Sequence, residues 1–508
     1  MDARALPFLG LGLSSNLDPA VEPDPWALHA AEPGLLDLVE YSAPVSLEVA
    51  EREAGLFGTL MASRARLPAL FHPVHLNLAG PELEPAGRLA ALEAHARAVG
   101  SPWVGNDVAW WHVRGQALPG YLYVPPPFSE AGLEVAAAHA LHVASALSVP
   151  LALENPVVVR REGPLHVLDF MARLHARTGC PLVLDVGHLV AAQLAAGLPL
   201  ETGLDGFPFE AVIEVHVAGA VITRTPEGRG VYLDDHGQPL RSEVLSLLAE
   251  VLPRCRALRA LVFEGDGHPA GVARRTLQLL RTMLDPVAER APLPLAPPRA
   301  EVPALPPDAP ALAWGSFDAA HGRGSPPADV VGARAEQGLR IAVTAEALDA
   351  HWPLSRPLLA PSRSTLERFL ASDAFRDAFA AGQPVDAGWA SWARSEVRAS
   401  GAPEQATALA FDTWAQGLAR APGGRSGVFA ADLGEALFAA RALRRHLAAR
   451  ALGEGVLPEG ALEGLAQALR RAPTRPWRAH ARWNRGRLEV GERGLDPPGS
   501  PGETSGPT

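Results

Sequence analysis

Apolar and polar positions alternate with two different periods along the first half of the chain. Short apolar runs of strand length recur, and most are separated by Ala-, Leu-, Glu- and Arg-rich segments of helical period, such as 84–99 and 129–147. We expect eight strands, at Leu6–Leu13, Leu36–Tyr41, Leu70–Leu78, Trp103–Trp110, Pro150–Glu154, Pro181–Val186, Ala211–Val217 and Leu258–Glu264. Eight strands alternating with helices predict an α/β fold, a (β/α)8 TIM barrel, whose usual size is about 250 residues. A doubly wound open sheet is the alternative, which the lack of a Gly-rich fingerprint after the first strand disfavours.

The second half of the chain follows a different pattern. Residues 291–312, APLPLAPPRAEVPALPPDAPAL, are rich in proline, which favours an extended, semi-rigid linker. From 313 to 490 apolar residues recur at three- and four-residue intervals, which predicts a smaller all-α domain. Its first long helix is expected to be capped by Ser364, with Glu367 three residues on. Residues 491–508 are predicted to be a disordered tail, so the barrel is expected at 1–290.

Net charge, cysteine content and the length of apolar runs argue against several classes of protein. The 508 residues carry a net charge of −11, which argues against a general nucleic-acid binder. The Arg- and Trp-containing segment 470–487 is expected to form a helix end and a turn. Contact with an acidic leader peptide and, ranked after it, contact with nucleic acid are the alternatives. Two cysteines, Cys180 and Cys255, cannot build a disulfide framework or a thiolate zinc site. No apolar run reaches the roughly 18 residues of a membrane span, and the first residues only faintly resemble a signal peptide, so we expect a cytoplasmic protein without a membrane partner.

Side chains that bind metals occur at or just beyond the ends of the predicted strands. The stretch 181–190, PLVLDVGHLV, places Asp185 and His188 in apolar surroundings, where an uncompensated charge costs on the order of several kcal/mol. The same pattern recurs at six further residues: His72, Glu154, His216, Asp234, His236 and Glu264. Because the carboxyl ends of barrel strands meet at one face, we expect these eight side chains to converge.

These residue types indicate a metal centre. Imidazoles and carboxylates without thiolates suit iron, manganese or zinc, and eight ligands exceed what one ion takes, so two or three ions are expected. Taken singly, each residue also has an ordinary structural explanation. A His can be hydrogen-bonded in a core, Glu154 can cap the next helix, and Asp234 with Asp235 can form a turn. Only the joint pattern favours metal binding.

The order and spacing of eight short motifs resemble one known family. The motifs are GLGL at 10–13, HPVHLNLAG, VGNDVAWW, LENP, LDVGH, VHVAG, DDHG and EGD. Over about residues 6–285 the chain resembles the multinuclear non-heme iron-dependent oxidative enzymes, which include the oxidase of methanobactin biosynthesis. The resemblance implies a xylose isomerase-like barrel in which the eight residues above bind two or three irons of mixed Fe2+/Fe3+ valence. It also implies O2 as co-substrate and a ribosomally synthesised precursor peptide, modified at cysteine, as substrate.

The chain departs from the family pattern at the fourth strand, which reads Gly105-Asn106-Asp107 in place of Ser, an acid and His. Asp107 is expected to replace that His as an acceptor. Asn106, Asp107 and Asp266 are predicted to orient the ligands around the reacting atoms. In this family a partner protein or domain presents the peptide. Here the fused helical domain either takes that role or serves for packing or dimerisation.

Other functions fit the same barrel. A metal-dependent hydrolase or phosphodiesterase of the endonuclease type would use similar ligands, although the strand-end loops carry little Arg for a nucleic-acid rim. A sugar isomerase would usually show a Lys near its metals, and this chain has no Lys. A non-enzymatic metal-binding scaffold is the remaining alternative.

Overall fold

The chain divides into two compact units, Met1–Glu336 and Gln337–Thr508. The computed structural model describes residues 5–287, 293–294, 301–420, 426–429, 433, 435–441, 443, 460–472, 477–484 and 487–492. Within these ranges, no helix combines the length and the apolarity that crossing a bilayer requires.

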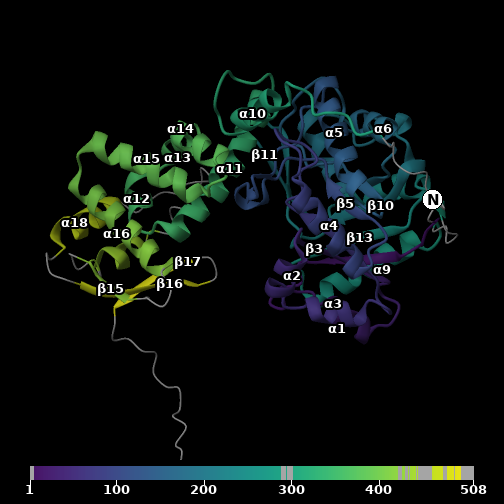
Figure 1. Ribbon diagram of the computed structural model, residues 1–508, viewed down its shortest axis with the longest axis horizontal. Helices are drawn as coiled ribbons and strands as arrows, with labels where there is room; N and C mark the ends of the chain where they lie inside the picture. The colour runs from purple at the N-terminus through teal and green to yellow at the C-terminus, as the bar shows by residue number, and fades with distance from the viewer. Residues whose placement is uncertain are drawn as a thin grey trace, which may run out of the picture. The chain divides into compact units, whose positions relative to one another are not determined.

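Eight parallel strands close into a barrel in the first unit (Figure 1). In sequence order they are β2 (Gly10–Ser15), β3 (Leu38–Pro44), β4 (Ala69–Val74), β5 (Val104–Asp107), β8 (Leu151–Glu154), β9 (Leu182–Asp185), β10 (Val212–Ala218) and β13 (Ala260–Glu264). The sheet closes where β9 pairs with β10. Each strand overlaps one of the eight expected from the sequence, so the predicted TIM barrel is confirmed.

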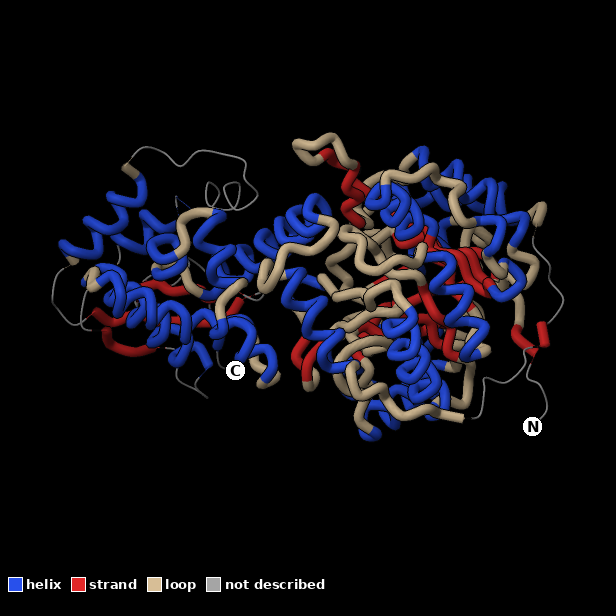
Figure 2. Tube along the Cα trace, turned by 90° about the horizontal axis from the view of Figure 1, so that it is seen from above, coloured by secondary structure: helices blue, strands red, loops and turns tan. Residues whose placement is uncertain are grey.

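Helices surround the barrel strands (Figure 2). They are α1 (Pro25–Ala31), α2 (Leu47–Glu53), α3 (Phe57–Ser63), α4 (Ala86–Val99), α5 (Glu130–Ala146), α6 (Val167–Thr178), α7 (Val186–Ala196), α8 (Ser242–Val251) and α9 (Ala270–Leu284). Local sequence explains their ends: Ser129 accepts a hydrogen bond from Gly132 N at the start of α5, and Gly179 ends α6 at a φ of 75°, which favours glycine. Two hairpins, β6 (His112–Val113) with β7 (Gln116–Ala117) and β11 (Ala220–Arg224) with β12 (Gly230–Asp234), extend loops of the barrel.

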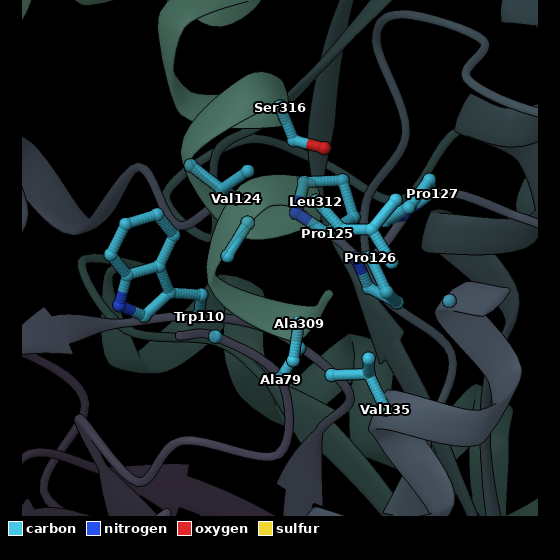
Figure 3. A pocket seen from close by; sticks show the side chains of 13 residues that line it. Ala79, Trp110, Val124, Pro125, Pro126, Pro127, Val135, Ala309, Leu312 and Ser316 are labelled. Atoms are coloured by element: carbon cyan, nitrogen blue, oxygen red, sulfur yellow. The ribbon is translucent and has the colours of Figure 1, made fainter. Parts of the chain in front are cut away.

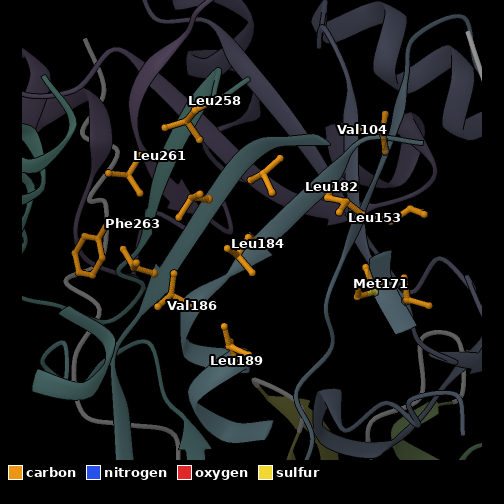
Figure 4. Close-up of a cluster of buried hydrophobic side chains, with 14 of the residues drawn as sticks. Val104, Leu153, Met171, Leu182, Leu184, Val186, Leu189, Leu258, Leu261 and Phe263 are labelled. Carbon is orange, nitrogen blue, oxygen red and sulfur yellow. The ribbon is translucent and has the colours of Figure 1, made fainter. Parts of the chain in front are cut away.

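Alternation along the strands produces two apolar layers. Side chains such as Leu153, Leu184 and Leu261 are buried between the sheet and the helices (Figure 4). A smaller set, which includes Leu38, Leu70, Trp103, Val183 and Val262, forms a separate buried cluster from the other side of the same strands. Because successive residues of a strand point to opposite faces, this second set fills the barrel interior. Burying each such Leu or Val contributes roughly 1.5–3 kcal/mol.

Part of the predicted linker belongs to the barrel unit. Residues 293–294 form β14 (Leu293–Pro294), which pairs with β1 (Ala5–Leu6), and α10 (Ala309–Ala320) begins inside the linker range. Trp110 contacts Trp314 and Phe317 of α10, with ring centroids 5.1 and 5.7 Å apart. Figure 3 shows the apolar gap beside this contact, lined by Trp110, prolines 125–127 and α10. Residues 291–292 and 295–300 lie outside the described residues.

A buried ion pair places the unit boundary later than the sequence suggested. The Arg160 side chain is buried and lies 2.8 Å from both Glu162 and Glu336. Separating a buried ion pair is costly because it leaves an uncompensated buried charge, so this pair holds residue 336 against the barrel. The compact barrel unit therefore continues to Glu336 rather than ending near residue 290.

The second unit is mainly helical. Its helices are α11 (Val330–His351), which contains the unit boundary, α12 (Ser355–Leu359), α13 (Arg363–Leu370), α14 (Asp373–Ala380), α15 (Val385–Ser400), α16 (Pro403–Arg420) and α18 (Ala461–Arg471). A buried cluster that includes Leu354, Phe411 and Leu465 forms its core. The cap of α13 is Ser362, which forms a capping box with Thr365, so the expected cap at Ser364 is wrong.

The second unit also contains a sheet, so the expectation of helices alone needs correction. Strands β15 (Ser426–Phe429), β16 (Trp477–Asn484) and β17 (Arg487–Glu492) pair in antiparallel fashion. The segment 470–487, expected to be a helix end and a turn, does begin with the end of α18 at Arg471, but Trp477–Asn484 form strand β16. The expected tail, 491–508, begins inside β17, and residues 493–508 lie outside the described residues.

Candidate metal centre

Because side chains alternate between the two faces of each strand, polar side chains also point into the barrel interior. They form a layer, called the polar layer below, between the inner apolar cluster and the carboxyl ends of the strands. On β9, Val183 belongs to the inner apolar cluster, and Asp185 follows two residues later on the same face. The same two-residue step leads from Leu38 to Glu40, from Leu70 to His72, from Ala152 to Glu154 and from Val262 to Glu264. The polar layer lies at the carboxyl ends of the strands, the face where the sequence predicted that the eight side chains converge.

Glu154 lies at the centre of this layer and is buried. Its Oε1 is 3.4 Å from His216 Nδ1 and 3.6 Å from His188 Nδ1, and its Oε2 is 3.8 Å from His72 Nε2. Glu154 does not cap the next helix, because α6 begins at Val167 with His166 as its N-cap. One carboxylate thus faces three imidazoles from separate elements.

A second group lies nearer to solvent. His236 Nε2 is 3.5 Å from Asp234 Oδ2 and 3.8 Å from Glu264 Oε2, and its Nδ1 is 3.6 Å from Asp266 Oδ2. Ser14 Oγ donates a 3.0 Å hydrogen bond to Asp266. The His236 side chain is 31% exposed, whereas His216 is fully buried. The polar layer is therefore open to solvent on the side of β12 and the loop that follows β13.

Asp185 and His188 are held together at the start of α7. Asp185 is the N-cap, and its side chain accepts a hydrogen bond from His188 N. Asn155 Nδ2 donates to Asp185 O at 2.9 Å, and Asp185 N donates to Asn155 Oδ1 at 3.0 Å. His188 Nδ1 lies 2.9 Å from Asn155 O, so this nitrogen carries the proton and donates. That leaves Nε2, 3.4 Å from Asp234 Oδ2, as the nitrogen available for a metal.

The three residues predicted to orient ligands lie in or beside this layer. Asp107 is closer to the imidazoles than expected, 4.0 Å from His72 and 3.7 Å from His188, and it accepts a 3.0 Å hydrogen bond from Tyr123. Asn106 donates to Pro73 O at 2.6 Å and supports the β4 strand end beside His72. Asp266 contacts His236, as described above.

Two buried carboxylates of the layer were missed by sequence reasoning. His216 Nε2 lies 3.2 Å from Glu40 Oε2 and 3.3 Å from Glu214 Oε1. The signal was present, because both are single carboxylates in apolar strands, the feature that drew attention to Asp185. Glu214 also precedes His216 by two residues and so shares its face of β10.

Burial and mutual charge shift the pKa values of these groups. Burial raises the pKa of both Asp107 and Asp185 to about 6 and that of Glu40 to about 8. Burial lowers the pKa of His72 to about 3. For His216, burial favours the neutral ring, but the attraction of Glu40, Glu154 and Glu264 outweighs it and raises the pKa well above the ordinary value. Neutral imidazoles and ionised carboxylates are the forms that bind metals, so a cation would relieve this set of competing charges.

Buried polar atoms that form no hydrogen bond indicate whether these residues suit metal ions. Within the described part of the chain, no hydrogen bond satisfies four sets of buried atoms: Glu154 Oε2, Asp185 Oδ2, His72 Nδ1, and both ring nitrogens of His216. Leaving such atoms unpaired costs about 1–3 kcal/mol each. Their ligand atoms converge in four overlapping groups: Glu40–His72–His216, His72–Asp107–Glu154, Glu154–Asp185–His188 and Asp185–His216–Glu264. The donor set therefore fits a centre of more than one cation, made of imidazole and carboxylate.

Comparison with known proteins assigns the barrel half to a family. Residues 31–279 match the family described as RiPP precursor modification enzyme MbnB/TglH/ChrH. A UPF0276 protein of Caulobacter vibrioides is 31% identical over 212 residues, which make up 41% of this chain and 74% of that protein. The chain belongs to the MbnB/TglH/ChrH family. The resemblance inferred from the motifs is thereby confirmed, and the family is one of enzymes.

Other similarities also cover about half of the chain. A UPF0276 protein of Streptomyces avermitilis is 32% identical over 278 residues, and the alignment spans 51% of this chain and 55% of that relative. A xylose isomerase-like TIM barrel protein from Mycobacterium smegmatis in complex with magnesium is 14% identical, with a TM-score of 0.38, over 56% of this chain and 99% of that one. Endonuclease IV from Thermus thermophilus is 21% identical, with a TM-score of 0.35, over 54% and 99% of the two chains.

Proposed function

We propose that this protein is a multi-iron oxidoreductase that uses O2 to modify a ribosomally synthesised precursor peptide at a cysteine. Membership of a family of RiPP precursor modification enzymes supports the peptide substrate. The observation that carries the iron proposal is the buried cluster of imidazoles and carboxylates, without a thiolate, in which several buried polar atoms have no hydrogen bond within the described residues.

Eight residues would hold two or three irons of mixed Fe2+/Fe3+ valence: His72, Glu154, Asp185, His188, His216, Asp234, His236 and Glu264. Asp107 lies close enough to two of the imidazoles to be a ninth donor. When bound, the irons would supply the redox chemistry, namely activation of O2 beside the cysteine sulfur.

The chain's own residues would exclude solvent, admit the peptide and orient the metal-binding rings. The buried inner side chains, Glu154, Asp185 and His216, exclude solvent from the closed end of the layer. The peptide would approach from the open side, where His236 and Asp234 are partly exposed. Asn155 and Asp266 orient His188 and His236 through the ring nitrogens that face them, which fixes which nitrogen of each ring binds metal.

The second unit would present the peptide in cis. Fusion of a peptide-binding unit to the barrel raises the effective concentration of substrate at the site without further contacts. The test is peptide affinity of the full chain against that of a chain ending at Glu336, the boundary of the barrel unit. Loss of affinity with retained iron supports presentation by the second unit, and unchanged affinity contradicts it.

The decisive experiment for the function loads the full chain with iron under anaerobic conditions and adds O2 and a peptide. The peptide is one encoded by a short, cysteine-rich reading frame beside this gene, and a Cys-to-Ser version of it is the matched control. We expect O2 uptake that depends on the cysteine, together with a change in peptide mass. Zinc-loaded protein should show neither, and hydrolysis of a phosphodiester by that form would favour a hydrolase instead.

A further inference from the structure

His216 lies between two sets of carboxylates inside the barrel. Its Nδ1 faces Glu154 at 3.4 Å and Glu264 at 3.7 Å. Its Nε2 faces Glu40 at 3.2 Å and Glu214 at 3.3 Å. The ring is fully buried, and within the described part of the chain neither nitrogen forms a hydrogen bond, so these carboxylates are the charged groups that each nitrogen faces.

Imidazole chemistry allows only one of the two sides to bind a cation. A neutral ring offers one nitrogen as a ligand, and the other carries a proton that it donates. The Nδ1 side adjoins Glu154, Asp185 and Glu264, which belong to overlapping groups of converging ligand atoms. The Nε2 side carries one such group, Glu40–His72–His216, and also faces Glu214. Because the Nδ1 side adjoins the other three groups, we place the metal on the Nδ1 side, with the Nε2–H facing the two deeper carboxylates.

The deeper carboxylates are themselves held in place. Trp103 Nε1 donates a 2.8 Å hydrogen bond to Glu214 Oε2, which leaves Oε1 directed at His216. Gly105 lies beside both groups, since a Cβ there would be in ordinary van der Waals contact with Glu214 Oε2 at 3.4 Å and His72 Nδ1 at 3.5 Å. Glu40 Oε2 also lies 3.9 Å from His72 Nδ1, so this one carboxylate faces the rear nitrogens of two rings.

We infer that Glu40 and Glu214 are positioning residues that set the metal-binding nitrogen of His216. They act through the imidazole, as carboxylates behind metal-bound histidines commonly do, and take no part in coordination. The inference rests on the proposed role of His216 as a metal ligand. It does not depend on which metal binds or on whether a peptide is oxidised.

The test is anaerobic titration of the metal-free full chain with Co2+, whose absorption bands report the ligand geometry. Glu40→Met and Glu214→Met keep the side-chain length but remove the acceptor, whereas Glu40→Gln and Glu214→Gln keep an acceptor oxygen. We expect the Met variants to bind Co2+ about 10–100-fold more weakly with changed bands, the number of ions per chain unchanged, and the Gln variants to recover most of the affinity.

A matched control comes from another buried carboxylate–imidazole pair. Glu84 lies 2.8 Å from His112 Nε2, outside the polar layer, and Glu84→Met should leave Co2+ affinity and absorption as in the unmodified chain. Wild-type affinity and spectrum in the Glu40 and Glu214 Met variants would overturn the inference. Loss of one whole ion per chain with the remaining bands unchanged would also overturn it, because the two carboxylates would then be ligands. Failure of the iron-loaded protein to oxidise a peptide would count against the proposed function alone.

Discussion

The Nδ1 atom of His216 lies 3.4 Å from Oε1 of Glu154, although β9 separates their two strands, β10 and β8, in the barrel. Neighbouring strands lie about 4.8 Å apart, so β8 and β10 are about 10 Å apart, and the two side chains span that distance in the barrel interior. Because interior side chains of a closed barrel converge, ligand geometry at the cluster is coupled to the folding of the barrel.

Replacement of Glu154 by Ala should reduce the number of metal ions bound per chain. Its carboxylate faces three imidazoles, so its loss removes the one group shared by the inner part of the cluster. We expect iron per chain to fall by at least one equivalent and O2-dependent peptide modification to drop by more than about 100-fold. Metal analysis and turnover measure the two effects. Glu210→Ala, an exposed carboxylate ahead of β10, is the control, and full iron content in the Glu154 variant would refute its place in the centre.

Removal of metal should lower the thermal stability of the chain. Without cations the buried carboxylates and imidazoles lose their compensation, and a ligand at about 1,000 times its dissociation constant contributes about 4 kcal/mol. We expect chelation to lower the melting temperature of the barrel transition by about 10 °C, with recovery on adding Fe2+ under anaerobic conditions. Differential scanning calorimetry measures this shift, and identical curves with and without chelator would contradict it.

The Arg160 ion pairs should be important for keeping residues 309–336 on the barrel. Arg160→Ala removes a buried guanidinium that pairs with both Glu162 and Glu336, which should cost about 3–5 kcal/mol of unfolding free energy. Denaturant unfolding gives the loss, and limited proteolysis should show earlier cleavage around α10. Arg177→Ala, which breaks a partly exposed pair with Glu130, should cost no more than about 1 kcal/mol. Equal effects of the two substitutions would count against a special role for Arg160.

The unfolding free energy of the second unit should depend on pH because buried Asp412 changes its protonation state. Burial raises the pKa of Asp412 to about 7, although it accepts hydrogen bonds from Leu354 N and Ser355 N. An unfolded Asp has a pKa of about 3.9, so between about pH 4 and pH 7 Asp412 is protonated in the folded chain and ionised in the unfolded chain. The favourable contribution of Asp412 is thus fully present below about pH 4 and is lost as the pH rises through about 7.

The corresponding substitution is Asp412→Asn, which keeps an acceptor oxygen and removes the titration. Compared with the unmodified chain, this variant should be more stable at pH 8, and the difference should shrink as the pH falls to 5. Urea unfolding at several pH values measures it. A difference that stays constant across that range would show that Asp412 does not titrate there.

The sequence predicted the barrel because its signal repeats eight times. Runs such as 181–186 contain enough branched apolar residues to mark strands, and polar residues at their ends mark the face where they meet. The structure brings all eight proposed ligands into one polar layer. Glu40 and Glu214 lie within their strands rather than at strand ends, so the strand-end pattern does not include them, and their positions follow from the two-residue alternation inside the barrel.

Other features depend on contacts that no local pattern records. Proline density predicted a linker over 291–312, but residues 309–320 form a helix because apolar side chains such as Phe317 can pack on Trp110. Strand β16 lies in an Arg-rich segment without strong alternation and pairs with β15 and β17 from distant and adjacent parts of the chain. Tertiary pairing outweighed local propensity in both places.

The central claim, a multi-iron centre, is tested most directly by metal analysis of the full chain purified without oxygen. The account predicts two or more irons per chain, with Mössbauer signals of both Fe2+ and Fe3+ after brief exposure to O2. Fewer than two irons per chain, with zinc at full occupancy, would contradict it.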